Sequence, residues 1–127
     1  SKEHDEYTLD EAAMAELKKA KLKSYQITAI VGTWCEDSHR EFPRMMKILE
    51  AADFPTEKLT IIAVNRKKES PEGEEGKFNI QRVPTFIIKK YGREIGRIVE
   101  MPKSGYLERD LVEILKKDDS SVKDLIK

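Results

Sequence analysis

The sequence of 127 residues contains a single cysteine, so no disulfide can form within the chain. Its 24 basic residues are balanced by 24 acidic ones, and therefore no net field attracts nucleic acid or an anionic membrane surface. No apolar run approaches the length of a membrane-spanning helix, and no glycine-rich phosphate loop is present. These absences argue against nucleic acids, membranes and phosphate-bearing cofactors as partners.

The length suits one domain, and neither a repeat nor a shift in composition indicates a second. We therefore expect one domain over residues 1–127, with a core over 25–101 and a frayed tail over 118–127. A single thiol suits both reducing and oxidising compartments, so the sequence leaves open the cytoplasm and the bacterial periplasm.

The spacing of apolar residues predicts helices that alternate with strands. Helices are expected from a capping box at Thr8 to about Lys23, from Glu36 to about Ala52 with a kink at Pro43, over a short segment ending near Ile80 after a charged loop, and after Ser104 as the cap. Strands are expected over 25–31 and 59–64, and as a hairpin of 85–90 and 94–100 with Gly92 in its turn. This order predicts an α/β fold with a mixed central β-sheet and helices on both faces.

The one cysteine, Cys35, directly follows the first predicted strand and precedes a predicted helix. A helix N-terminus carries partial positive charge and free backbone N–H groups, which favour the thiolate over the thiol. Because the thiolate is the nucleophile, this placement predicts a reactive residue. Glu36 and Asp37 oppose the effect, because like charge close to the sulfur disfavours the thiolate.

Several motifs occur together in one order and spacing. Trp34-Cys35-x-x-Ser38 follows the strand, Pro43 lies eight residues beyond the cysteine, and Val83-Pro84-Thr85 precedes the hairpin. Over about residues 25–101 the chain thereby resembles thioredoxin. The resemblance implies a thioredoxin-like fold in which a cis Pro84 lies beside Cys35. It also implies that the backbone of Val83 pairs with an extended stretch of a substrate protein, beside a groove bordered by Trp34.

Two positions depart from the thioredoxin pattern. Ser38 stands where the family has its second cysteine, and Ala29 stands where thioredoxin proper has a buried acid. In the dithiol mechanism the second thiol releases the mixed disulfide, which a hydroxyl cannot do at neutral pH. The resemblance therefore implies a single-thiol variant that depends on a second molecule to complete its cycle.

Our first hypothesis is a monothiol thiol–disulfide oxidoreductase, in which Cys35 attacks protein disulfides or glutathione adducts. Ser38 is expected to donate a hydrogen bond to the thiolate, and Trp34, Val83 and Pro84 are expected to bind the substrate. Glutathione or a dithiol reductase would supply the external thiol, and no cofactor is expected.

Two alternatives stay open. The chain could be a redox-inactive peptide-binding module in which Cys35 is dispensable, or a sensor that is capped reversibly at Cys35. His39 lies one helical turn beyond Cys35 and could add charge when protonated. A zinc site at this pair is not expected, because zinc needs three or four protein ligands and His4 is the only other histidine.

Overall fold

The computed structural model describes residues 2–65 and 79–118. Within them, four strands form one sheet in the order β2-β1-β3-β4. The strands are β1 (Gln26–Gly32), β2 (Leu59–Val64), β3 (Thr85–Lys90) and β4 (Arg93–Val99). β1 pairs in parallel with β2, whereas the β1–β3 and β3–β4 pairs are antiparallel. The predicted α/β fold with a mixed central sheet is therefore confirmed.

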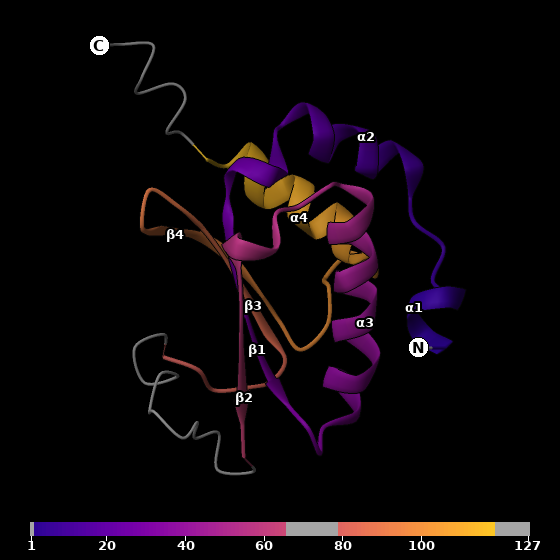
Figure 1. Cartoon of the computed structure of the whole chain (residues 1–127), viewed down its shortest axis with the longest axis vertical. Helices are drawn as coiled ribbons and strands as arrows, with labels where there is room; N and C mark the ends of the chain where they lie inside the picture. The colour runs from indigo at the N-terminus through magenta and orange to yellow at the C-terminus, as the bar shows by residue number, and fades with distance from the viewer. Residues whose placement is uncertain (1, 66–78, 119–127) are drawn as a thin grey trace.

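The sequence predicted helices on both faces of the sheet, whereas the helices of the described residues pack together on one face (Figure 1). They are α1 (Lys2–Glu6), α2 (Glu11–Lys19), α3 (Glu36–Ala51) and α4 (Leu107–Lys116), with short 3₁₀ turns at Leu22–Ser24 and Thr56–Lys58. The main core lies between these helices and the sheet, and its fully buried side chains include Leu17, Met45, Ile48, Phe86 and Leu111. The body of the helix expected before Ile80 and the tail expected after 118 lie outside the described residues.

A second, smaller apolar cluster lies on the opposite face of the sheet. Because side chains alternate along a strand, Ala29 of β1 joins the main core while its neighbour Ile30 joins this second cluster. The other buried members are Ile62, Val64, Val83 and Ile87. Trp34 and Cys35 pack against this cluster, so the predicted thiol site lies at its border.

The helix starts differ from the sequence prediction. α2 begins after Asp10 rather than Thr8, because the Asp10 carboxylate accepts hydrogen bonds from the backbone N–H groups of Ala12 and Ala13. It ends at Lys19 instead of continuing to about Lys23, because the chain turns through a left-handed residue at Lys21. The expectation of a capping box at Thr8 was therefore wrong.

The expected cap of the last helix was also wrong. α4 begins at Leu107, and its N-cap residue is Tyr106 rather than Ser104. The Ser104 hydroxyl instead donates to the carboxylate of Asp110, which also accepts hydrogen bonds from the backbone N–H groups of Lys103 and Ser104. The serine thus holds the approach to α4 in place without capping its first turn.

The N-terminal segment is attached to α4 through a buried carboxylate. Glu108 has no exposed surface, and it accepts hydrogen bonds from the Tyr7 hydroxyl at 2.5 Å and from the Asp10 backbone N–H at 2.8 Å. Burial and the bond to Glu108 raise the pKa of Tyr7. The N-terminal segment is therefore held against α4, the last described helix, by these two hydrogen bonds.

Candidate thiol site

Cys35 lies in the turn between β1 and α3, at the lower end of the molecule in Figure 1. Its backbone is extended, and it occupies the N-cap position of α3 without a hydrogen bond from its side chain to the helix. Its own N–H donates to Gly32 O at 3.2 Å, and its carbonyl accepts from the His39 N–H at 3.1 Å. These backbone hydrogen bonds fix the turn. The Cys35 sulfur is partly exposed and makes no capping hydrogen bond to the helix.

The sulfur lies against the loop that precedes β3. The Cys35 thiol is 3.5 Å from the carbonyl oxygen of Val83, to which it donates a hydrogen bond. The peptide bond between Val83 and Pro84 is cis, and both residues are buried. Three of the site residues proposed from the sequence are thus brought together across a separation of 48 residues.

Ser38 is buried on the first turn of α3, where its hydroxyl accepts a hydrogen bond from the Gly32 N–H at 3.1 Å. This bond satisfies a buried backbone donor and ties the start of α3 to the end of β1. No hydrogen bond joins the Ser38 hydroxyl to the Cys35 sulfur, and both residues are among those described. The sequence did not predict that the Ser38 hydroxyl would lie beside β1.

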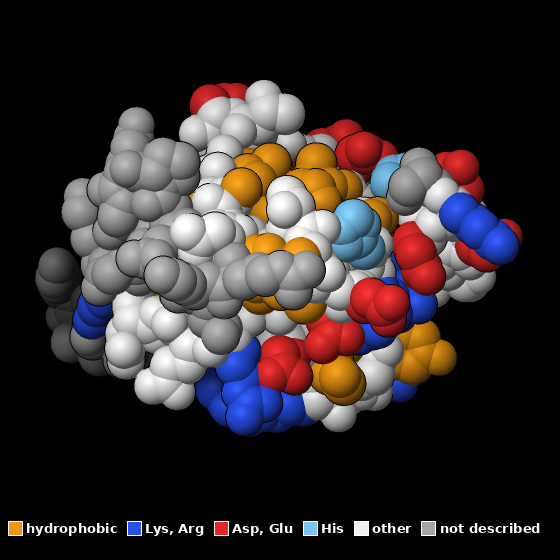
Figure 2. All heavy atoms as spheres, turned by 90° about the horizontal axis from the view of Figure 1, so that it is seen from below, with side chains coloured by type: hydrophobic (Ala, Val, Ile, Leu, Met, Phe, Trp, Pro, Cys, Tyr) orange, Lys and Arg blue, Asp and Glu red, His pale blue; other side chains and the backbone are white. Residues whose placement is uncertain are grey.

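The ring of Trp34 lies directly on Gly32. A Cβ atom at Gly32 would come within 2.7 Å of the indole ring. Only glycine at position 32 therefore allows the ring to lie where it does. Apolar side chains gather on this end of the molecule, and acidic side chains lie beside them (Figure 2). The partly buried Trp34 packs against the second apolar cluster, together with Cys35.

Charged groups surround the first two turns of α3. The Arg40 guanidinium binds two carboxylates, Asp37 at 2.7 Å and Glu41 at 2.6 Å, which together raise the pKa of Arg40. Glu41 is only 2 % exposed, and its Oε1 atom has no hydrogen-bond partner in the described part of the chain. Sequence reasoning missed Glu41, although its spacing from Ser38 and Met45 places it on the buried face of the helix.

The His39 ring is exposed, and its Nε2 atom donates a hydrogen bond to the Thr33 carbonyl. Because a carbonyl only accepts, this bond places a proton on Nε2. The ring orientation is therefore set by the turn that carries Cys35, a contact that no sequence pattern indicated.

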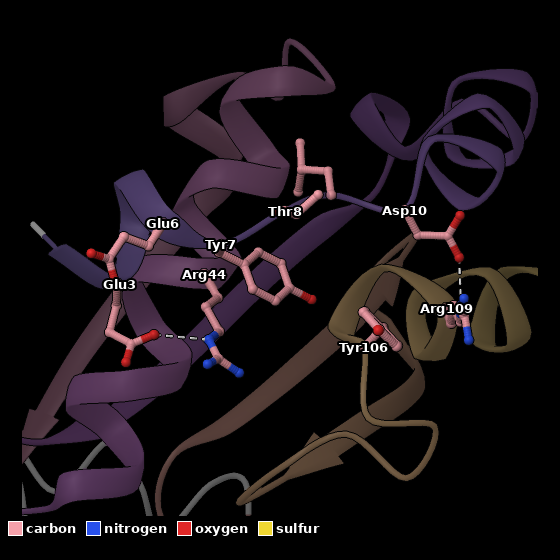
Figure 3. Close-up of a pocket in the computed structure, with 9 residues that line it drawn as sticks. Glu3, Glu6, Tyr7, Thr8, Asp10, Arg44, Tyr106 and Arg109 are labelled. Atoms are coloured by element: carbon pink, nitrogen blue, oxygen red, sulfur yellow. Dashed lines mark hydrogen bonds and ion pairs between the residues drawn. The ribbon is translucent and has the colours of Figure 1, made fainter.

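A hollow of about 550 Å³ lies away from the thiol, between the N-terminal segment, α3 and α4. In it Arg44 points toward Glu3, and Arg109 toward Asp10 (Figure 3). None of the five site residues proposed from the sequence lines this hollow.

Two other kinds of site were sought in the described residues. No group of three or more histidine, cysteine, aspartate or glutamate side chains is placed to hold a metal ion there. Among the helices that the structure describes, none has the length and apolar character to cross a membrane.

No protein-family model and no curated protein matches this sequence. Solved structures do match the fold. A Pseudomonas aeruginosa protein of unknown function has a TM-score of 0.59 at 14% identity, covering 90% of this chain and 76% of its own. Thioredoxin-2, a component of the malaria parasite protein secretion machinery, has a TM-score of 0.54 at 19% identity, covering 75% and 84%. Trxlp from Edwardsiella tarda has a TM-score of 0.51 at 16% identity, covering 84% and 94%.

These similarities define the class of the molecule. The chain has a thioredoxin-like fold, with one cysteine at the start of α3. At such low identities the likeness concerns the fold, and it assigns no activity to the thiol.

Proposed function

We propose that this chain is a monothiol thiol–disulfide oxidoreductase with Cys35 as its nucleophile. The observation that carries the proposal is the position of the Cys35 sulfur, at the N-terminus of α3 and 3.5 Å from the Val83 carbonyl beside a cis proline. The helix terminus favours the thiolate. The Val83 backbone lies next to the sulfur, where a substrate strand could pair with it.

The cycle consists of two exchange steps. The Cys35 thiolate attacks one sulfur of a substrate disulfide, so that a mixed disulfide forms and the other sulfur leaves as a thiolate. A second thiol, from glutathione, from a dithiol reductase or from the same substrate, then attacks the mixed disulfide and releases Cys35 as a thiolate. The new disulfide joins the second thiol to the substrate sulfur that Cys35 held, and the other substrate sulfur is left as a thiolate, so a second thiol from another molecule supplies the electrons. When the second thiol belongs to the same substrate, the disulfide is only moved and no net reduction occurs.

The site supports an external second thiol. Ser38 occupies the position of a resolving cysteine, yet its hydroxyl binds the Gly32 N–H. The chain contains no other cysteine, so the mixed disulfide cannot close into an internal disulfide. We therefore expect a covalent adduct with the substrate to accumulate whenever external thiol is scarce.

The test uses a glutathionylated model protein and a protein with an accessible disulfide, each with reduced glutathione as the second thiol. The appearance of free thiol on the model protein is measured with the parent chain and with Cys35→Ser. We expect acceleration by the parent, no acceleration by the variant, and a mixed disulfide by mass spectrometry when glutathione is omitted. Equal rates for the two proteins would overturn the proposal. If Cys35→Ser also bound peptides as tightly as the parent, the chain would be a binding module.

A further inference from the structure

The segments that form the thiol site carry more acidic than basic side chains. On the first two turns of α3, the carboxylates of Glu36, Asp37 and Glu41 accompany one guanidinium, that of Arg40. Arg40 is shared between Asp37 and Glu41, and Glu41 also pairs with the Arg44 guanidinium at 4.0 Å. These two carboxylates are therefore matched by two guanidinium groups. Glu36 is exposed, and it has no ion pair in the part of the chain that the structure describes.

The loop on the other side of the sulfur does not restore the balance. Arg82 directly precedes Val83, but its guanidinium is paired with the Glu100 carboxylate at 2.6 Å. Glu100 itself belongs to the site, because its backbone N–H donates to the Pro84 carbonyl at 2.8 Å. The four carboxylates of the site are accompanied by three paired guanidinium groups, those of Arg40, Arg44 and Arg82. The excess is therefore one carboxylate, that of Glu36, whereas the whole chain is neutral.

We propose that this local negative charge makes Cys35 selective for protein disulfides flanked by lysine or arginine, and disfavours glutathione as the group that is attacked. Glutathione carries two carboxylates and one ammonium group, so the site repels it. A cationic neighbour of a protein disulfide is attracted by the same groups. The inference rests on the proposed function, because it concerns which disulfide the Cys35 thiolate attacks.

Glu36 is the residue through which this selectivity can be measured. Its carboxylate is exposed on the first turn of α3, directly after Cys35, so Glu36→Gln removes one charge with little change in shape. Glu11→Gln is the matched control, because Glu11 is also an exposed first residue of a helix, far along the chain from the thiol. Both substitutions have the same effect on a helix macrodipole.

The experiment compares two methanethiosulfonates of similar size, the 2-aminoethyl cation and the 2-sulfonatoethyl anion. Each transfers its alkylthio group to the Cys35 thiolate, so that an S–S bond forms and methanesulfinate leaves. Both rates contain the same thiolate fraction, which therefore cancels in their ratio. The amide of N-acetylcysteine, a neutral thiol, provides the reference ratio.

We expect the cation-to-anion rate ratio of Cys35 to exceed the reference by about fivefold at low salt, and to fall by about twofold to fivefold in Glu36→Gln. Glu11→Gln should retain the parent ratio, and high salt should remove the preference. A parent ratio equal to the reference would overturn the inference, and so would a ratio that Glu36→Gln leaves unchanged.

This result is separate from the test of the proposed function. If both reagents modify Cys35 faster than the reference thiol but without a charge preference, only the selectivity fails. If the parent accelerates thiol release from neither of the two model proteins, the proposed function fails whatever the ratio.

Discussion

The hydroxyl of Tyr7 donates to a carboxylate that is cut off from solvent, and its removal tests how the N-terminal segment is held. Tyr7→Phe deletes one oxygen atom and keeps the ring, which also lies 4.9 Å from the Arg44 guanidinium. Glu108 then keeps only the hydrogen bond from the Asp10 N–H. One oxygen of a buried carboxylate would lose its partner.

A hydrogen bond to a charged group contributes about 1.5–3 kcal/mol, and an unsatisfied buried acceptor costs a similar amount. The bond measures 2.5 Å, and Glu108 is 0% exposed, so solvent cannot replace the lost donor. We therefore expect Tyr7→Phe to lower the free energy of unfolding by about 2 kcal/mol. For a chain of this size that loss corresponds to a fall in Tm of about 8 °C.

Urea and thermal unfolding, followed by circular dichroism, measure the change. Tyr106→Phe is the matched control, because it makes the same substitution at an exposed tyrosine, which stacks on Arg109. The control should change the free energy of unfolding by less than about 0.5 kcal/mol. Equal stabilities for the two variants would refute the reasoning, because the bond to Glu108 would then contribute nothing.

Three further predictions concern the site and the pH response. Gly32→Ala should destabilise the chain by about 1–3 kcal/mol and shift the emission of Trp34, because the new Cβ would meet the indole ring at 2.7 Å; unchanged emission and stability would speak against the packing. Ser38→Cys should form an internal disulfide with Cys35 and gain insulin reduction with dithiothreitol, and an oxidised variant that still has two free thiols would contradict this. Burial and acidic neighbours raise the pKa values of Tyr7 and Tyr25 above 10, so above about pH 10 the unfolded chain loses protons that the folded chain keeps, and stability should fall. The loss of stability with pH should be smaller in a Tyr7→Phe, Tyr25→Phe double variant. Urea unfolding above that pH gives the free energy of unfolding as a function of pH, and equal slopes for the two proteins would contradict the prediction.

The strands could be predicted from local patterns because their residues are apolar and β-branched. β2 spans Leu59–Val64, the same bounds that the sequence predicted, and β1 is displaced by one residue. The helix starts were less predictable, because several polar residues compete to be the cap. Thr8 and Asp10 are both good N-caps, and only the extended backbone of Asp10 and its carboxylate geometry decide between them.

The sequence predicted some features of the thiol site and missed others. The position of Cys35 at the end of a strand follows from local pattern, whereas its proximity to Val83 came from the resemblance to thioredoxin, because no local rule joins residues 48 apart. The bond from Gly32 to Ser38 depends on a side-chain rotamer, which the sequence does not indicate. Glu108 could have been found, because it lies beside Leu107 and Leu111 on the apolar stripe of α4.

The bond between Tyr7 and Glu108 also bears on the kinetics of folding. It joins residues 101 positions apart, so its formation early in folding would close a loop of nearly the whole chain. Contacts that close so long a loop are costly to form early. We therefore expect the bond to form late in folding, so that Tyr7→Phe raises the rate of unfolding more than it lowers the rate of folding. By slowing unfolding, the attachment of the N-terminal segment to α4 would lengthen the lifetime of the folded state.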